Sequence, residues 1–368
     1  MIDKRLEKLA YILLHHSLKI KKNDLFVISG SPLAAPLIKE VYKQAVQAGA
    51  YPFTRIGIEG LAEIYYKYAS EKQLKYVSPI SKFEIENIDA RLAIISQENT
   101  KNMSNIDPKK QALSSTAMRE IHQIFLQRAA NKELRWCVTQ YPTNAAAQDA
   151  EMSLSDYEDF VFHAAHVDKR DPVKHWNTVF KEQEKVRTLM DSKKKLHVIA
   201  KDTDLTVDVS DRKWINCYGR ENFPDGEVFT GPVENSAEGY IRYSFPACHG
   251  GREVDDIKLW FHKGKVVKTE ATKGKKFLES MLDMDKGSRR LGEFAFGLNY
   301  GIKKYTKNTL FDEKIGGTIH LAVGSGYPET GSKNVSSLHW DMMCDLRKYG
   351  EVYADNELIY KNGTFITI

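Results

Sequence analysis

The chain has 368 residues, of which 42% are hydrophobic and 28% are charged, so the composition is that of a globular protein and excludes intrinsic disorder. Lysine and arginine number 54 against 49 aspartates and glutamates, an excess of +5. This excess is small for the length and argues against a nucleic-acid binder. At roughly 150 residues per domain, the length favours two domains.

The cysteines and the N-terminal segment indicate where the protein resides. Cys137, Cys217, Cys248 and Cys344 form no CxxC pair, which excludes a disulfide framework and a thiolate zinc knuckle. The N-terminal segment has a short apolar run at residues 9–14 without a small-residue cleavage site, and no stretch approaches 18 apolar residues. We expect a soluble protein with free thiols in a reducing cytoplasm, and no membrane partner.

The first half of the chain alternates between helix and strand patterns. In chain order, the expected elements are a helix at 6–13, a strand at 24–29, a helix at 33–48 closed by Gly49, and a strand at 51–56. A strand, a helix and a strand predict a parallel pair with a right-handed crossover. Further strands at 92–96 and 134–139 extend it to an open, largely parallel sheet.

The second half has a β-rich pattern. A charged helix at 171–195 leads to expected strands at 196–200, 205–209, 259–262 and 266–269, a helix at 275–284, and a hairpin turn at Asn362-Gly363. With the border near residue 190, the sequence predicts an N-terminal α/β domain (residues 1–190). An α+β, β-rich C-terminal domain (residues 191–368) follows it.

Three motifs have competing interpretations. The turn Ser29-Gly30-Ser31-Pro32 lacks the glycine pattern of dinucleotide-binding sites. The stretch 326–333 resembles a P-loop, but its lysine is displaced by one residue and Glu329 would repel phosphate. Cys248-His249 leaves a thiol nucleophile open as an alternative, although no base and orienting group can be identified for it.

Six metal-ligating side chains gather in the last 150 residues. They are Glu227, Glu293, Glu313, His320, His339 and Asp341. His339 and Asp341 are two residues apart, so an extended segment places both on one face. Each residue alone has an ordinary structural interpretation, such as a turn carboxylate or a core histidine. Together, carboxylates that bridge two cations and imidazoles that complete each coordination shell suit a paired-metal hydrolase.

In order and combination, these motifs identify a family. They are the Phe-Pro-Asp-Gly-Glu run ending at Glu227, Gly-Glu-x-x-x-Gly around Glu293, Phe-Asp-Glu ending at Glu313, Gly-Tyr-Pro-Glu-Thr-Gly around Tyr327, and His339-Trp340-Asp341. The whole chain resembles the aminopeptidase T / aminopeptidase S family of dinuclear metallo-aminopeptidases. The spacing between Glu313 and His320 varies between branches of that family, and Ser332 replaces an expected glycine.

The resemblance implies a site and an assembly. The six residues above become the ligands of two divalent ions, zinc first and cobalt or manganese as alternatives, with Glu293 bridging the ions. Tyr327 and Glu293 are the implied catalytic residues, Tyr327 because its phenol can hydrogen-bond the developing oxyanion. The resemblance also implies a homodimer.

We therefore expect a metal-dependent aminopeptidase that acts on peptides with a free N-terminus. Glu329 or Glu234 is a candidate to bind the substrate ammonium, and four bulky residues suggest an apolar wall beside it. These four are Phe229, Phe294, Phe296 and Trp340. Two alternatives remain open: a metal-stabilised binding module without catalysis, and a metal-dependent dipeptidase or other amidohydrolase.

Overall fold

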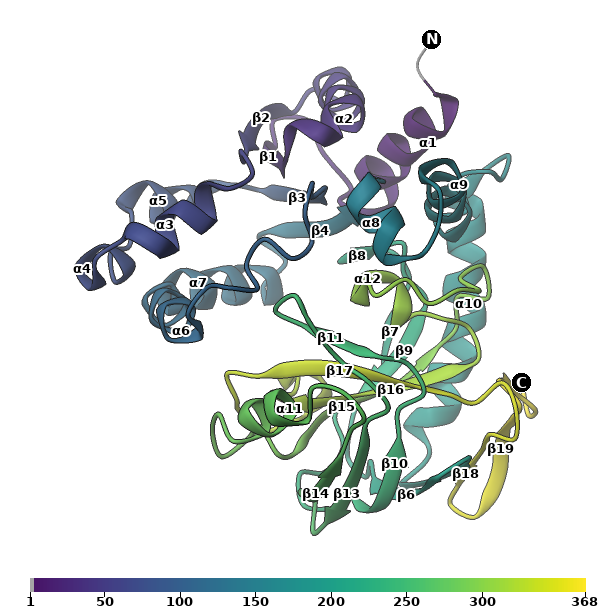
Figure 1. Cartoon of the computed structure of the whole chain (residues 1–368). Helices are drawn as coiled ribbons and strands as arrows, with labels where there is room; N and C mark the ends of the chain where they lie inside the picture. Colours follow the sequence, from purple (N-terminus) through teal and green to yellow (C-terminus); the bar gives the residue numbers. More distant parts are fainter. Residues whose placement is uncertain (1–2) are drawn as a thin grey trace. The chain divides into compact units, whose positions relative to one another are not determined.

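The computed structural model describes residues 3–368, which form two compact units (Figure 1). Unit 1 runs to Val173 and includes Gly219–Phe223, and unit 2 comprises Lys174–Tyr218 and Pro224–Ile368. Unit 2 thus begins before the border expected near residue 190, because helix α10 (Pro172–Asp191) is bound to it through Gln183. No helix within residues 3–368 is both long and apolar enough to cross a membrane.

Unit 1 is built on a parallel sheet. Its strands, in sheet order, are β2 (Tyr51–Ile56), β1 (Leu25–Gly30), β3 (Ala90–Ile95), β4 (Arg135–Gln140) and β8 (Asn222–Phe223). Every neighbouring pair is parallel, and Leu25 of β1 lies beside Tyr51 of β2. The predicted strand–helix–strand unit and the open α/β sheet are therefore confirmed.

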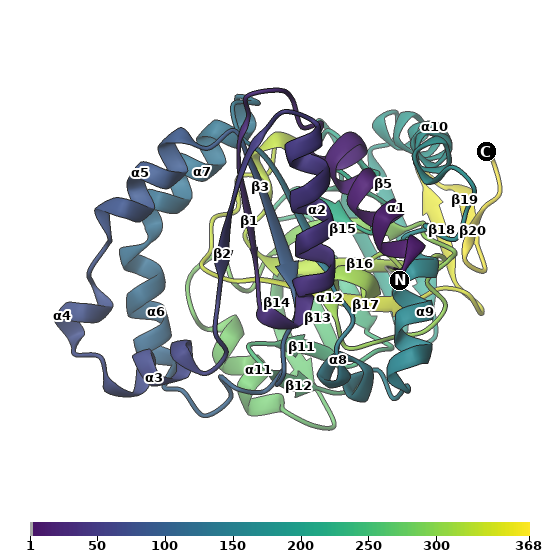
Figure 2. The same cartoon turned by 90° about the horizontal axis from the view of Figure 1, so that it is seen from above.

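Helices connect these strands. They are α1 (Lys4–Ile12), continued by a π-helical turn (Leu13–Ser17), a 3₁₀ turn (Pro32–Ala34), α2 (Ala35–Gln47), α3 (Leu61–Tyr68), α4 (Glu71–Leu74), α5 (Pro79–Asn87), α6 (Pro108–Ala117), α7 (Arg119–Ala130), α8 (Asn144–Asp149) and α9 (Leu154–Ala164). Of these, α2, α5 and α7 pack against the sheet. Helices α1 and α2 lie side by side, as do α5 and α7 (Figure 2). Ile85 of α5 and Ile124 of α7 pack in one cluster with Val27 of β1.

Unit 2 contains two antiparallel sheets and a separate hairpin. The larger sheet has the order β14 (Lys265–Glu270), β13 (Lys258–His262), β10 (Glu238–Arg242), β6 (Thr203–Asp208), β5 (Lys195–Ala200), β18 (Glu351–Ala354), β19 (Glu357–Lys361) and β20 (Thr364–Phe365). The smaller sheet has the order β17 (His339–Asp345), β16 (Thr318–Gly324), β15 (Leu291–Gly297), β9 (Glu227–Thr230) and β7 (Ile215–Cys217). The remaining elements are β11 (Ala247–His249), β12 (Arg252–Val254), α11 (Lys275–Leu282), α12 (Thr309–Asp312) and a 3₁₀ turn (Pro328–Thr330).

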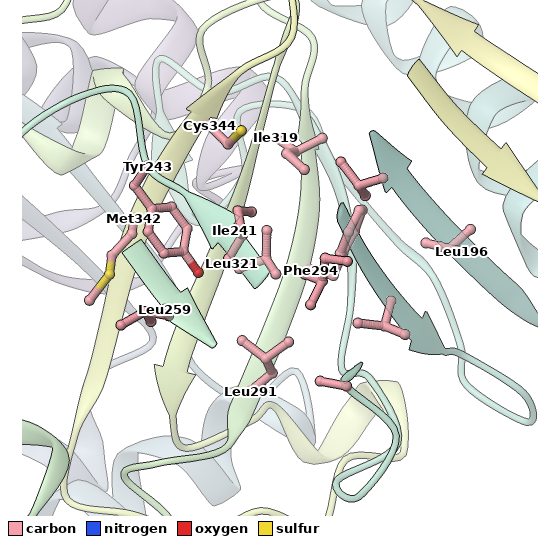
Figure 3. Close-up of a cluster of buried hydrophobic side chains, with 14 of the residues drawn as sticks. Leu196, Ile241, Tyr243, Leu259, Leu291, Phe294, Ile319, Leu321, Met342 and Cys344 are labelled. Carbon is pink, nitrogen blue, oxygen red and sulfur yellow. The ribbon is translucent and has the colours of Figure 1, made fainter. Parts of the chain in front are cut away.

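One hydrophobic core joins the two sheets of unit 2. Phe294, Leu321 and Met342 of the smaller sheet share a cluster with Leu196 and Leu259 of the larger sheet (Figure 3). Because side chains alternate along a strand, the smaller sheet directs these residues to one face and leaves its other face for different side chains. The β-rich second half is confirmed, and so is the hairpin turn, where Asn362 and Gly363 have φ values of 48° and 85°.

Candidate metal centre

The register of the smaller sheet brings carboxylates and imidazoles to the face opposite the core. Ala322 of β16 pairs with Glu293 of β15 on one side and with Asp341 of β17 on the other. His320 precedes Ala322 by two residues and therefore shares its face. Since alanine has a small side chain, Ala322 leaves space between the two carboxylates.

Strands β17 and β9 add two more ligand candidates to this face. His339 begins β17 opposite Gly324, and with Asp341 two residues later it shares one face, while Trp340 between them packs in the core. Glu227 begins β9 opposite Gly297 of β15. The strands thus supply five of the six predicted ligand candidates.

Glu313 comes from a different element. It caps the C-terminal end of the short helix α12, and it is brought together with His320 and Asp341. The structure therefore brings together all six residues selected from the sequence, although they are separated by up to 114 positions, from Glu227 to Asp341.

Short distances connect the six side chains into overlapping groups. Three groups have ligand atoms within 4.8 Å of one another: Glu227, Glu293 and His320; Glu293, His339 and Asp341; and Glu313, His320 and Asp341. Nε2 of His320 lies 3.3 Å from Oε1 of Glu293, and Nε2 of His339 lies 3.4 Å from Oε2 of Glu293. Glu293, His320 and Asp341 are each common to two groups, and Glu293 presents a different oxygen to each histidine, as a bridging carboxylate has to.

Several polar atoms in these groups are buried without a hydrogen-bond partner. They are Oε2 of Glu227, Nδ1 of His320 and Oδ1 of Asp341. An unsatisfied buried polar atom is costly, and a cation would relieve that cost for the two carboxylate oxygens. Oxygen and imidazole nitrogen are ligands that zinc, manganese and cobalt accept, so the residues present fit divalent metal ions.

Burial and mutual charge shift the pKa values of these groups. Burial raises the pKa of Glu227 to about 8. Burial disfavours the charged form of both histidines, but Glu293 raises the pKa of His320 to about 9 and Asp341 raises that of His339 to about 10. Without a metal ion, protons therefore supply the positive charge that this cluster requires.

Sequence reasoning missed Lys314, which is buried among the carboxylates. Its Nζ lies 2.6 Å from Oε1 of Glu227, 2.7 Å from Oε1 of Glu313 and 3.7 Å from Oδ1 of Asp225. Although burial opposes the charged form, Glu227 and Glu313 raise the pKa of Lys314 well above its usual value. A lysine directly after a candidate ligand is the only signal in the sequence, and that position alone does not indicate burial.

Tyr327 lies beside the cluster, on the loop that follows β16. Its ring contacts the ring of His339 with centroids 5.2 Å apart, and the ring of Phe229 with centroids 5.3 Å apart. Burial and the carboxylate of Glu293 raise the pKa of the Tyr327 phenol above its usual value. The phenol is therefore protonated and can donate a hydrogen bond at neutral pH.

The bulky residues proposed as an apolar wall divide between the two faces of the sheet. Phe294, Phe296 and Trp340 belong to the hydrophobic core, because their positions alternate with those of Glu293, Ala295 and Asp341. Phe229 alone of the four lies on the ligand face, in register with Ala295. Of the four, Phe229 therefore lies beside the cluster, where it contacts Tyr327.

The two carboxylates considered for the substrate ammonium also differ. Both oxygens of Glu234 are engaged, since Oε2 accepts from Arg212 at 2.8 Å and Oε1 accepts from the Lys333 amide at 2.6 Å. Glu329 is exposed on the 3₁₀ turn that follows Tyr327. Glu234 thus stabilises the loop, and Glu329 is the more accessible carboxylate.

The side chains of Cys248 and His249, the alternative thiol site, lie beside different residues. Sγ of Cys248 lies 3.8 Å from the hydroxyl of Tyr305, and the ring of His249 packs on Trp340 with centroids 5.3 Å apart. The two side chains therefore contact different partners, as expected for neighbours on a β-strand.

Comparisons with known proteins found similar sequences and a similar structure. The profile of the peptidase family described as thermophilic metalloprotease (M29) matches residues 2–365. The chain is 26% identical to aminopeptidase 2 of Geobacillus stearothermophilus, covering 91% of this chain and 87% of that protein, and 26% identical to aminopeptidase T of Thermus thermophilus, covering 98% and 96%. The solved structure of wild-type AmpT from Thermus thermophilus matches the whole of both chains at 25% identity and a TM-score of 0.86, which confirms the predicted fold class.

Proposed function

Because the chain belongs to the peptidase family M29 of metalloproteases, we propose that it is an aminopeptidase that removes the N-terminal residue of peptides with the help of two divalent metal ions. Its matched relatives are named aminopeptidases. The observation that carries the two-ion proposal is the position of Glu293, whose Oε1 lies beside His320 and whose Oε2 lies beside His339. One ion would be held by Glu227, Glu293 and His320, and the other by Glu293, His339 and Asp341, with Glu313 beside them.

The proposed chemistry combines these ions with the side chains around them. Bound there, divalent ions would polarise the scissile carbonyl and lower the pKa of a water molecule. Zinc is the preferred ion and cobalt or manganese the alternative, because the ligand candidates are oxygen and imidazole. Glu293, placed between both ion positions, is the carboxylate that we propose would hold the two ions around the attacking water, whereas a glutamate not fully engaged as a ligand, or a metal-bound hydroxide itself, would handle its proton.

Tyr327 and Phe229 would act on the substrate. The protonated phenol of Tyr327 donates a hydrogen bond to the oxygen that becomes negative during attack on the carbonyl. Phe229 packs against Tyr327 and supplies apolar surface for the first side chain of the peptide. Glu329, exposed on the following turn, binds the free ammonium of the substrate, which makes the enzyme an exopeptidase.

Two further parts of the proposal concern assembly and location. Strand β2 is an outer strand of its sheet, and apolar side chains of β2 and α3 are exposed, among them Tyr51, Ile56, Leu61 and Ile64. Exposed apolar side chains in this number support a homodimer, to be measured by sedimentation. The four cysteines form no disulfide within residues 3–368, which supports a cytoplasmic location.

The test is release of leucine from leucyl-p-nitroanilide and from di- and tripeptides. The protein is assayed as purified, after chelation, and after zinc, cobalt or manganese is restored. We expect activity that chelation removes, that metal restores, and that is absent with N-acetylated substrates. Hydrolysis of dipeptides alone, or of blocked substrates, would favour a dipeptidase or another amidohydrolase. Tight metal binding without any hydrolysis would favour a metal-stabilised binding module.

A further inference from the structure

Lys314 places a fixed positive charge at the edge of the candidate metal centre. Its side chain is 1% exposed, and the carboxylates of Glu227 and Glu313 accept from it at 2.6 and 2.7 Å. A lysine ammonium is almost never fully buried unless it is paired, and here two carboxylates meet that requirement. Lys314 therefore connects two ligand candidates that come from different elements, strand β9 and the end of helix α12.

The two oxygens of Glu227 have different surroundings. Oε1 is held by Lys314, whereas Oε2 lies 3.3 Å from Nε2 of His320 and has no hydrogen-bond partner. Since a carboxylate is planar, fixing one oxygen fixes the direction of the other. Lys314 thus keeps Oε2 of Glu227 directed toward His320 and Glu293, where a cation would bind.

Lys314 offsets part of the negative charge that gathers in the cluster. Five carboxylates meet there: Asp225, Glu227, Glu293, Glu313 and Asp341. Two divalent ions would supply four positive charges against five negative charges, and the ammonium of Lys314 supplies the fifth. Cys217, Asp225 and Glu227 also form a group of possible ligands, and Lys314 lies on that side of the cluster. The ammonium thus fills the place where those groups would otherwise attract another cation.

We propose that Lys314 is a positioning residue of the metal centre, which holds Oε1 of Glu227 and Oε1 of Glu313 and so orients Glu227 toward the ion shared with His320 and Glu293. This inference rests on the proposed function for the presence of the ions, but not for the reaction. Groups that orient metal ligands in this way typically change metal affinity by about 10- to 100-fold when they are removed.

The experiment compares metal binding in the full-length protein and its variants without substrate. Lys314→Met removes the charge and the donor but retains the length of the side chain, and Lys314→Gln removes the charge but retains an N–H donor. Lys193→Met is the matched control, because Lys193 is 14% exposed and pairs with Glu357 at 2.7 Å in the same unit, outside the candidate ligands. Zinc per chain and zinc affinity are measured by competition with a chromophoric chelator, and the ligand geometry is followed by the visible absorption of bound Co²⁺.

We expect one zinc ion to bind about 10- to 100-fold more weakly in Lys314→Met, with a changed cobalt spectrum, and wild-type values in Lys193→Met. A purely structural role would lower stability without changing the cobalt spectrum of folded protein. If Lys314→Met does not fold, Lys314→Gln decides the question by the same measurements. Wild-type zinc affinity and an unchanged spectrum in a folded Lys314 variant would overturn the inference. Wild-type protein that binds zinc but hydrolyses no peptide would instead refute the proposed function alone.

Discussion

Oε2 of Glu293 lies 3.4 Å from Nε2 of His339, while Oε1 of the same carboxylate lies 3.3 Å from Nε2 of His320. The two histidines come from neighbouring strands, β17 and β16, and Glu293 from the next strand, β15. A single carboxylate therefore presents one oxygen to each imidazole. Both oxygens are needed if both groups of ligand candidates are to hold an ion.

Substitution of Glu293 tests this double role. An amide offers only one oxygen, and its NH₂ group repels a cation, so we expect Glu293→Gln to lose at least one of two bound ions. Peptide hydrolysis should fall by more than about 100-fold, because the bridging charge is removed. Metal content by atomic spectroscopy and the rate of leucyl-p-nitroanilide hydrolysis are the measurements.

A matched control is Glu238→Gln, an exposed carboxylate of strand β10 that pairs with His262 at 3.1 Å. It should retain full metal content and activity. Two ions per chain in Glu293→Gln at wild-type affinity would contradict the bridging role.

The sequence pattern predicted which residues lie on the same face of a strand more reliably than which strands and helices pack against each other. The spacing of His339 and Asp341 was sufficient to place them together, because strand alternation is a local property. The same alternation assigns Phe294 and Trp340 to the core, a conclusion that requires knowing which face is buried. That knowledge depends on the packing of two sheets, which no local pattern specifies.

The position of Lys314 could not be predicted for a related reason. Its contact with Glu227 spans 87 residues and depends on α12 ending beside β9. Lysine is one of the residues least often buried, so composition argues for an exposed side chain. Gln183 is similar: its Nε2 donates to the carbonyl of Glu227 at 3.1 Å from helix α10. Groups that support the ligands are therefore the part of the site that sequence patterns miss.

Substitution of Tyr327 separates transition-state stabilisation from metal binding. Tyr327→Phe removes only the hydroxyl and retains the ring contacts with Phe229 and His339. We expect kcat to fall by about 10²- to 10³-fold with KM and metal content nearly unchanged, since the lost hydrogen bond acts on the developing oxyanion. Steady-state kinetics on a leucyl peptide series measure this split. A higher KM at unchanged kcat would instead assign Tyr327 to substrate binding.

The raised pKa values of the histidines predict that metal binding depends on pH. In the metal-free protein, His320 and His339 have pKa values of about 9 and about 10, above the usual 6.5. Their protonated forms therefore contribute stability below about pH 6.5, and this contribution is lost as the pH rises through 9 and 10. Metal binds the deprotonated imidazoles, so zinc affinity should rise over the same range.

Calorimetry in buffers with different ionisation enthalpies measures the protons involved. At pH 7.5 we expect the binding of two zinc ions to release at least about two protons per chain, because both imidazoles are protonated beforehand. The variant His262→Gln, altered at an exposed histidine away from the cluster, should release the same number. Binding without proton release would show that His320 and His339 are neutral in the metal-free protein or do not bind the ion.

Ala322 provides a last test, because it occupies the space between Glu293 and Asp341. Ala322→Val adds two methyl groups on the face that carries the ligand candidates. Overpacking of a buried position costs about 1–3 kcal/mol. If that cost falls on the metal-bound state, zinc affinity drops by about 5- to 150-fold.

The control is Ala237→Val, which adds the same volume to the core cluster. We expect Ala237→Val to lower the melting temperature without changing zinc affinity, and Ala322→Val to lower zinc affinity. Equal zinc affinity in both variants would show that the ions bind away from Ala322. Glu293 and Asp341 would then not be ligands of the same ion.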